Sequence, residues 1–272
     1  MNREFARLKR RDFLRLACLT GLGVAIPLTK LSGILGSDSR QLELRRSINA
    51  LGTTVTITVE DDFSSARAEA GINDAFSEIR KLEAQLTRFQ SSSQVHRLNQ
   101  VGQVEVPTPE LVEALRKARY FSNRTEAAFD ITVKPALDLL QTYLVGASLP
   151  SDAEFEAARS LIDFELLSVS KSGVSLGKPG MGVTLDCIGK GYILDKAAER
   201  LREHGIRSAL IQGGGTLVAI GARLDGSPWR IGVRDPENPS GVVGRITLVD
   251  RAVATSGDYE NFFSPDERYY HI

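Results

Sequence analysis

The chain has 272 residues, of which 42% are hydrophobic and 25% charged, which suits one large or two small folded domains with a real core. Its 34 basic and 34 acidic residues balance overall, but the basic ones are enriched near the N-terminus, so the remainder is mildly acidic. Because that remainder has no basic clusters, we exclude nucleic acid as a partner.

Residues 1–36 carry seven of the lysines and arginines and are expected to direct export or to serve as an anchor. A basic stretch at residues 9–11 precedes the apolar run 16–28, which is too short to span a bilayer comfortably. The paired arginines, with Phe13 and Leu14 behind them, are typical of a twin-arginine signal; a Sec-type signal is the alternative. We therefore expect export across the cytoplasmic membrane, to the periplasm or to a membrane-associated position.

Two cysteines are present, and Cys18 lies inside the N-terminal apolar run. An exported chain whose one remaining thiol is Cys187 forms no internal disulfide and depends on its core for stability. We expect Cys187 to be a small buried residue at a tight turn and not a catalytic thiol.

The sequence after the N-terminal segment predicts one strand followed by a long helix. Residues 37–46 are polar and charged and are expected to be a linker, and residues 47–59 alternate in polarity as a strand does, after a tight start. A serine at position 64 or 65 is suited to cap a helix that runs to about residue 86. Apolar residues at helical spacing predict its core face: Phe76, Ile79, Leu82, Leu86 and Phe89.

Further helices follow, with one apolar run between them. Thr108 and Pro109 provide a cap and a first turn, so we expect a helix to about residue 122. Residues 127–133 predict a short buried run interrupted by one carboxylate. A helix that starts at Pro135 is expected to end before Gly146.

A capping box and a hairpin lead to the middle of the chain. Ser151 and Glu154 have the spacing of a capping box, which predicts a helix to about residue 161. Residues 164–185 predict a hairpin, a loop and a short β-type run at 183–185.

The best-defined predicted unit is a helix that follows the tight turn holding Gly189 and Gly191. Gly205 is placed to end this helix in the left-handed conformation, and an apolar strand at 208–212 then returns to the glycines 213–215. The helix carries one apolar stripe: Ile193, Leu194, Ala197, Ala198 and Leu201.

Strands are also expected at 229–233, at 244–249 and from residue 252 into a polar turn near 259. Helices are concentrated in the first half and hairpins in the second. The chain therefore predicts an α+β fold, with mixed, largely antiparallel sheets and packed helices in a domain spanning 47–272.

Lys190 is the first candidate for chemistry, because it lies in the first turn of the central helix beside glycines. A helix N-terminus with a cation is a natural site for a phosphate. The pattern is neither a Walker loop nor a dinucleotide fingerprint, and a solvated lysine beside a glycine-rich hairpin remains the alternative.

Asp130 is the second candidate, because its neighbours Phe129 and Ile131 are apolar and a carboxylate there must be paired, protonated or bound. A structural hydrogen bond is the alternative.

No histidine or cysteine pair has zinc spacing and no serine lies in a nucleophile elbow. Carboxylates, one lysine and glycine turns therefore favour phosphoryl chemistry with Mg²⁺ over acyl transfer.

Seven segments, in this order, resemble the motifs of the ApbE-type FAD:protein FMN transferases. The resemblance as a whole covers about residues 48–272, and each segment alone would be weak evidence. The segments are Leu51-Gly52-Thr53, residues 87–99 from Thr87 to Asn99, Ala128-Phe129-Asp130 with Thr132, Val133 and Pro135, Lys190-Gly191-Tyr192 with Asp195, the glycines 213–215, residues 228–236, and residues 255–259.

The resemblance implies that FAD is cleaved at its diphosphate, that FMN passes to a threonine or serine of an exported or membrane flavoprotein, and that AMP is released. It implies Mg²⁺ as cofactor, with the Cys187 backbone carbonyl as a ligand. Catalytic roles would fall to Asp130, Lys190 and Asp258. The residues that would line the FAD site are Leu51, Phe89, Ala128, Phe129, Asp130, Thr184, Lys190, Thr255, Ser256 and Ile272.

Two departures from the family pattern shape the expectation. Thr184 stands where the family often has an acid, and the chain stops at Ile272, before the segment that supplies the family's other metal ligands. We expect a chain that lacks the C-terminal part of the domain. The alternatives are an FAD-binding carrier or assembly factor without transferase activity and an Mg²⁺-dependent FAD pyrophosphatase.

Overall fold

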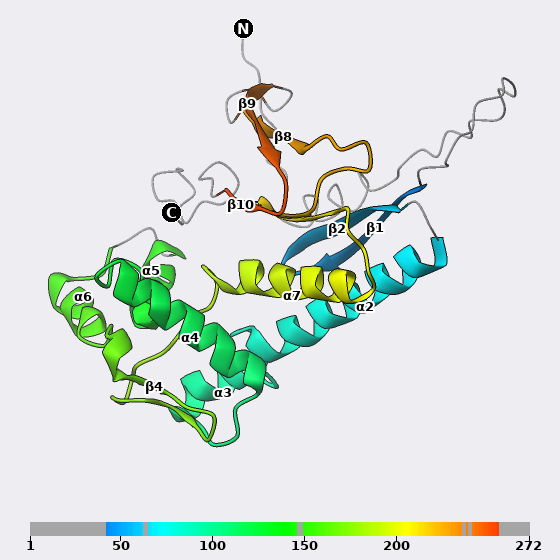
Figure 1. Cartoon of the computed structure of the whole chain (residues 1–272). Coiled ribbons are helices and arrows are strands. Elements are labelled where there is room, and N and C mark those ends of the chain that lie inside the picture. Colours follow the sequence, from blue (N-terminus) through cyan, green and yellow to red (C-terminus); the bar gives the residue numbers. More distant parts are fainter. Residues whose placement is uncertain (1–41, 62–64, 146–148, 236–237, 239–240, 256–272) are drawn as a thin grey trace, which may run out of the picture. The chain divides into compact units, whose positions relative to one another are not determined.

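A five-stranded sheet forms the centre of the described structure (Figure 1). The computed structural model describes residues 42–61, 65–145, 149–235, 238 and 241–255. Every pair of neighbouring strands in this sheet is antiparallel. In spatial order the strands are β1 (Leu42–Ala50), β2 (Thr53–Asp61), β6 (Ala209–Gly213), β7 (Thr216–Ile220) and β10 (Ala252–Ala254).

Strands β1 and β2 form a hairpin with a two-residue turn, and this hairpin corrects two expectations. Leu51 and Gly52 have positive φ angles of 56° and 69°, as a type I′ turn requires. Residues 47–59 therefore belong to two strands. The tight segment at Leu51 and Gly52 is the turn between these strands and not the start of a single strand. The expected linker 37–46 is wrong for residues 42–46, which belong to β1 because Leu44 packs against the core.

Helices α2 (Ser65–Leu86) and α7 (Gly189–Glu203) pack against one face of this sheet (Figure 1). The apolar stripes expected on both helices are buried, with one exception. Phe89 is 71% exposed. The expectation fails because α2 ends three residues earlier and the chain turns there, with the Ser93 hydroxyl donating to the Thr87 carbonyl.

Two of the remaining helices, which begin after Thr108 and Ser151, are capped as their sequences predict. The Thr108 hydroxyl accepts the N–H of Leu111, and Ser151 and Glu154 form the capping box. The helices are α3 (Gln94–Val101), α4 (Pro109–Arg124), α5 (Lys134–Val145) and α6 (Asp152–Arg159), with 3₁₀ turns η1 (Ile131–Val133) and η2 (Phe164–Leu166). A small antiparallel sheet contains β3 (Gln103–Val104), β5 (Val174–Leu176) and β4 (Leu167–Val169). Helices beside antiparallel sheets confirm the expected α+β class.

The segment 127–133 is a loop followed by the 3₁₀ turn η1, and not the buried run that we expected. Ala127 and Ala128 are exposed, and burial begins only at Ile131. The reason is local: Glu126 and Ala127 have positive φ angles of 51° and 66°, which turn the chain sharply after α4.

The end of α7 and the return strand agree with the sequence, but the run before α7 does not. Gly205 has a φ of 75° and donates its N–H to the Arg202 carbonyl, so it ends the helix as expected. Gly214 and Gly215, with φ of 49° and 83°, form the turn between β6 and β7. The run 183–185 is buried but belongs to no strand, because side chains and a 3₁₀ turn take its backbone groups.

Strands β8 (Trp229–Arg234) and β9 (Val242–Leu248) form a two-stranded sheet, as their apolar runs predict. Leu217 and Ala219 of β7 join the apolar cluster of this sheet, whereas the alternate residues of β7 belong to the main core. Successive side chains of β7 point to opposite faces of the central sheet, so both faces carry apolar side chains there.

Several expectations fall on residues that the structure leaves undescribed. They concern the export signal at 1–36 and three site residues, Ser256, Asp258 and Ile272. Within the described ranges, no helix combines the length and the hydropathy that crossing a bilayer requires.

Candidate functional site

Lys190 lies where two hairpin turns meet the start of α7. A Cβ atom added to Gly214, in the β6–β7 turn, would lie 3.1 Å from Lys190 Nζ and 3.0 Å from Thr53 Oγ1. The lysine is half-buried, and its ammonium group has no ion pair or hydrogen bond to any residue that the structure describes. A side chain at position 214 would occupy the space beside this cation, so the glycine keeps that space open.

The first turn of α7 presents unsatisfied backbone groups. Its N-cap, Ile188, offers no side-chain hydrogen bond. The N–H groups of Gly189 and Tyr192 donate to the preceding loop, but those of Lys190 and Gly191 have no acceptor among the described residues. Two free donors, the helix dipole and the adjacent ammonium group together favour an anion here.

Thr255 joins the same group of turns from β10. Its N–H donates to the Gly215 carbonyl at 3.0 Å, and its hydroxyl donates to the same oxygen at 3.2 Å. A Cβ atom on Gly215 would lie 2.9 Å from the Thr255 hydroxyl oxygen. The structure therefore brings Thr255 and Lys190 to the two glycines of one turn, with Leu51 two residues from Thr53 at the neighbouring hairpin end.

Asp130 has the structural hydrogen bonds that the sequence left as an alternative. Its Oδ1 accepts the N–H and the hydroxyl of Thr132, both at 2.7 Å, and its Oδ2 accepts the N–H of Phe164 at 3.0 Å. Both carboxylate oxygens are thus used to cap η1 and to tie it to η2. This arrangement fixes the loop that carries Ala128 and Phe129.

The loop before α7 lies against η1. Thr184 is buried, and its N–H donates to the Ile131 carbonyl at 2.8 Å. The side chain of Asn99 holds both backbone groups of Val183, accepting from the N–H at 2.7 Å and donating to the carbonyl at 2.9 Å. These bonds bring Thr184 beside the segment of Phe129 and Asp130, although more than fifty positions separate them in sequence.

Arg88 joins two segments of the candidate site, and nothing in the sequence pointed to it. Its Nε donates to Asp186 Oδ2 at 2.8 Å, its guanidinium lies 4.2 Å from the centre of the Phe89 ring, and Asp138 is 3.9 Å away. The Arg88 side chain is only 11% exposed. It connects the exposed Phe89 to the loop before α7. No sequence signal could show this pair, because its partners are 98 positions apart.

Cys187 is exposed, and not buried as expected, because it lies in the loop that leads into α7. Partial desolvation, with the Asp186 carboxylate next to it, raises the pKa of the Cys187 thiol. The sulfur is therefore protonated and a poor nucleophile or metal ligand at neutral pH. Its backbone carbonyl accepts no hydrogen bond from the described residues, so this oxygen is free to bind a cation.

The described residues do not assemble a complete metal site. They contain no group of three or more histidine, cysteine, aspartate or glutamate side chains placed to hold an ion. A cleft of about 530 Å³ opens elsewhere, along α4, and includes none of the expected site residues. Its lining is Pro107, Pro109, Val112, Glu113, Arg116, Lys117, Tyr120 and Lys171.

The sequence of this chain is similar to those of a known protein family. The model of the ApbE family matches residues 51–272. An FAD:protein FMN transferase of Treponema pallidum is 28% identical over 271 residues, covering 92% of this chain and 75% of that protein. The enzyme of the same description from Vibrio cholerae is 28% identical over 256 residues, covering 91% and 76%.

Solved structures give the same result. The ApbE protein of Thermotoga maritima superposes with a TM-score of 0.73 and 30% identity, over 85% of this chain and 75% of that one. The apo flavinyl transferase ApbE of Pseudomonas stutzeri gives 0.71 and 27%, over 85% and 73%. The fold and the sequence therefore point to the same group of proteins.

Proposed function

This chain belongs to the ApbE family, and from that membership we propose that it is an FAD:protein FMN transferase. One observation carries the proposal beyond the family: Lys190, without a protein partner in the described part of the chain, lies beside Gly214 and two free helix N–H groups. A cation and donors of this kind are suited to the diphosphate of FAD.

The other site residues have places consistent with this ligand. Phe89 offers an exposed ring and Phe129 a ring that is partly buried against the core, and both lie on loops that meet the segment before α7. Phe129 lies 6.3 Å from Phe121, edge to face. We propose that these loops hold the flavin and adenosine parts, with Leu51, Ala128, Thr184 and Thr255 contributing contacts and Ser256 and Ile272 doing so from outside the described residues.

The reaction moves one phosphoryl group. The hydroxyl oxygen of the acceptor attacks the FMN phosphorus, the bond from that phosphorus to the bridging oxygen breaks, and AMP leaves with the bridging oxygen. The hydroxyl proton passes to a carboxylate. Because both oxygens of Asp130 are occupied by hydrogen bonds, we assign the proton to Asp258 and a positioning role to Asp130.

Mg²⁺ is part of the proposal. The free carbonyl of Cys187 fits one position of a magnesium site, and the remaining ligands would come from diphosphate oxygens, water and residues outside the described ranges. When bound, the ion neutralises charge on the diphosphate and stabilises the departing phosphate. Lys190 supplies the second positive charge from the protein itself.

The acceptor is proposed to be an exported or membrane flavoprotein that presents a threonine or serine. The twin-arginine pattern near the N-terminus supports export to the periplasm or to the outer surface of the cytoplasmic membrane, where the enzyme and its acceptor would share one compartment. A fusion of residues 1–46 to a reporter tests this, since replacing Arg10 and Arg11 by lysine should stop its export.

In-gel flavin fluorescence tests the function. The chain is incubated with FAD, Mg²⁺ and an acceptor domain, beside a sample with EDTA. A fluorescent acceptor band that EDTA abolishes is expected. FAD binding without a band would leave a flavin-binding protein, and release of free FMN would leave a pyrophosphatase.

Arg88→Ala is expected to weaken FAD binding roughly tenfold, because the loop that carries Asp186 and Cys187 loses its ion pair. Flavin fluorescence titration measures the affinity. Arg97→Ala is the matched control, since Arg97 is exposed on α3 and its guanidinium forms no hydrogen bond or ion pair with the residues that the structure describes. Equal affinities for the two variants would contradict the role of Arg88.

A further inference from the structure

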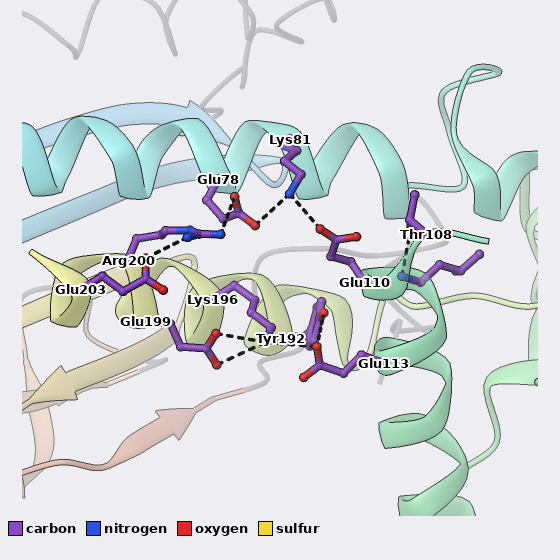
Figure 2. Close-up of polar contacts among 11 residues, drawn as sticks. Glu78, Lys81, Thr108, Glu110, Glu113, Tyr192, Lys196, Glu199, Arg200 and Glu203 are labelled. Atoms are coloured by element: carbon purple, nitrogen blue, oxygen red, sulfur yellow. Dashed lines mark hydrogen bonds and ion pairs between the residues drawn. The ribbon is translucent and has the colours of Figure 1, made fainter. Parts of the chain in front are cut away.

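Tyr192 connects the first turn of α7 to helix α4. Its hydroxyl donates to Glu113 Oε2 at 3.0 Å (Figure 2). The ring is 2% exposed and lies between two cations, with Lys117 Nζ 5.3 Å and Lys196 Nζ 5.6 Å from its centre. A buried ring with a satisfied hydroxyl is a fixed point between the two helices.

The charges around this contact keep it formed at neutral pH. Desolvation acts against ionisation of Glu113, but the hydrogen bonds from Lys196 and Tyr192 outweigh it and lower the pKa of the carboxyl group. Burial, and then the bond to Glu113, raises the pKa of Tyr192 well above its usual value. The tyrosine is therefore a donor and Glu113 a charged acceptor, which makes this a charge-assisted hydrogen bond.

The same acid holds a second point of α7. Lys196 Nζ lies 3.1 Å from Glu113 Oε2 and 3.0 Å from Glu199 (Figure 2). Glu113 thus binds two residues on consecutive turns of α7, four positions apart. This carboxylate therefore ties two consecutive turns in the N-terminal half of α7 to one point on α4.

The first turn of α7 needs such support. It has no capping side chain, and two of its N–H groups have no acceptor in the described structure. Helix ends of this kind fray readily. Lys190 is two residues before Tyr192, so the tyrosine holds the turn from one side while the lysine extends from another toward Gly214.

We propose that Tyr192 and Glu113 are positioning residues that hold the Lys190 side chain in place for the FAD diphosphate. They act through the helix and do not touch the substrate. The inference rests on the proposed role of Lys190, and it assigns the tyrosine of the Lys190-Gly191-Tyr192 segment a function distinct from packing.

Tyr192→Phe tests the proposal, because it removes the hydroxyl and keeps the ring. The expected result is a roughly tenfold loss in FAD affinity and in transfer rate, with Tm changed by no more than about 2–4 °C. Glu113→Gln is expected to give a similar loss, because it removes the negative charge to which Tyr192 and Lys196 both bind. Tyr120→Phe is the matched control, since Tyr120 lies on α4, the helix that carries Glu113, and is 58% exposed.

A second arm separates positioning from general structure. In a Lys190→Ala background, adding Tyr192→Phe should cause no further loss in FAD affinity or in transfer, because the group that it positions is already gone. An equal further loss would overturn the proposal, as would unchanged affinity for Tyr192→Phe alone.

The two readouts also distinguish the inference from the function. If the unaltered chain binds FAD but transfers nothing, the proposed transferase activity fails and the affinity arm still decides the role of Tyr192. If Lys190→Ala leaves affinity unchanged, there is nothing for Tyr192 to position, and the inference fails even where transfer is observed.

Discussion

Lys190→Ala should lower flavin transfer by roughly 100-fold or more and weaken FAD binding, the largest effect on activity that we expect from one substitution. The ammonium group is half-buried and unpaired within the described structure, so its charge is available to the ligand. As the diphosphate is cleaved, negative charge accumulates on the departing phosphate. A fixed cation beside it therefore stabilises the transition state more than the ground state.

Two comparison variants make this result specific. Lys190→Arg keeps the charge but changes its shape, and we expect intermediate activity. Lys178→Ala is the matched control, because Lys178 is exposed and its ammonium group donates to the Ser160 carbonyl at 3.4 Å and to none of the site residues. Transfer rate and FAD titration are measured on each variant. Affinity and rate for Lys190→Ala equal to those of Lys178→Ala would remove Lys190 from the site.

Leu194→Ala should have the largest effect on stability, lowering the free energy of unfolding by about 2–5 kcal/mol. Leu194 is fully buried on α7, and its Cδ1 lies 3.4 Å from the point that a Cβ on Gly213 would occupy. It therefore packs between α7 and the strand that leads into the Gly214 turn. The substitution leaves a cavity there, because helix and sheet cannot both close on it.

Urea unfolding measures this loss, and the chain offers a control with the same change of side chain. Leu149→Ala also replaces leucine by alanine, but Leu149 is 58% exposed, so we expect a change within about 0.5 kcal/mol. A similar midpoint for both variants would show that α7 and β6 are not packed as described. Weakened FAD binding by the folded Leu194→Ala protein would follow from movement of the Gly214 turn.

Local features of the fold could be predicted from sequence because their causes are local. The caps at Thr108 and Ser151 depend on side chains three residues from the groups that they bind. Gly205 ends α7 because a left-handed residue is needed at that point. The position of Lys190 in the first turn of a helix was predictable for the same reason.

Features that depend on distant segments could not be predicted. Phe89 fits the helical spacing of α2, but the helix ends before it, and Arg88 stacks on its exposed ring. The bond from Tyr192 to Glu113 joins residues 79 positions apart. Without an alignment of related sequences, no pattern in the chain connects such pairs. The segments of the site were therefore predictable one by one, but the bonds that join them were not.

Mass spectrometry of the acceptor, combined with measurement of released AMP, tests the central claim most directly. We expect each acceptor molecule to gain one FMN on a threonine or serine, with one AMP released for each FMN transferred. Replacing that hydroxyl residue by alanine should abolish both products. AMP and free FMN released together, with the acceptor mass unchanged, would contradict this expectation and leave an enzyme that only hydrolyses FAD.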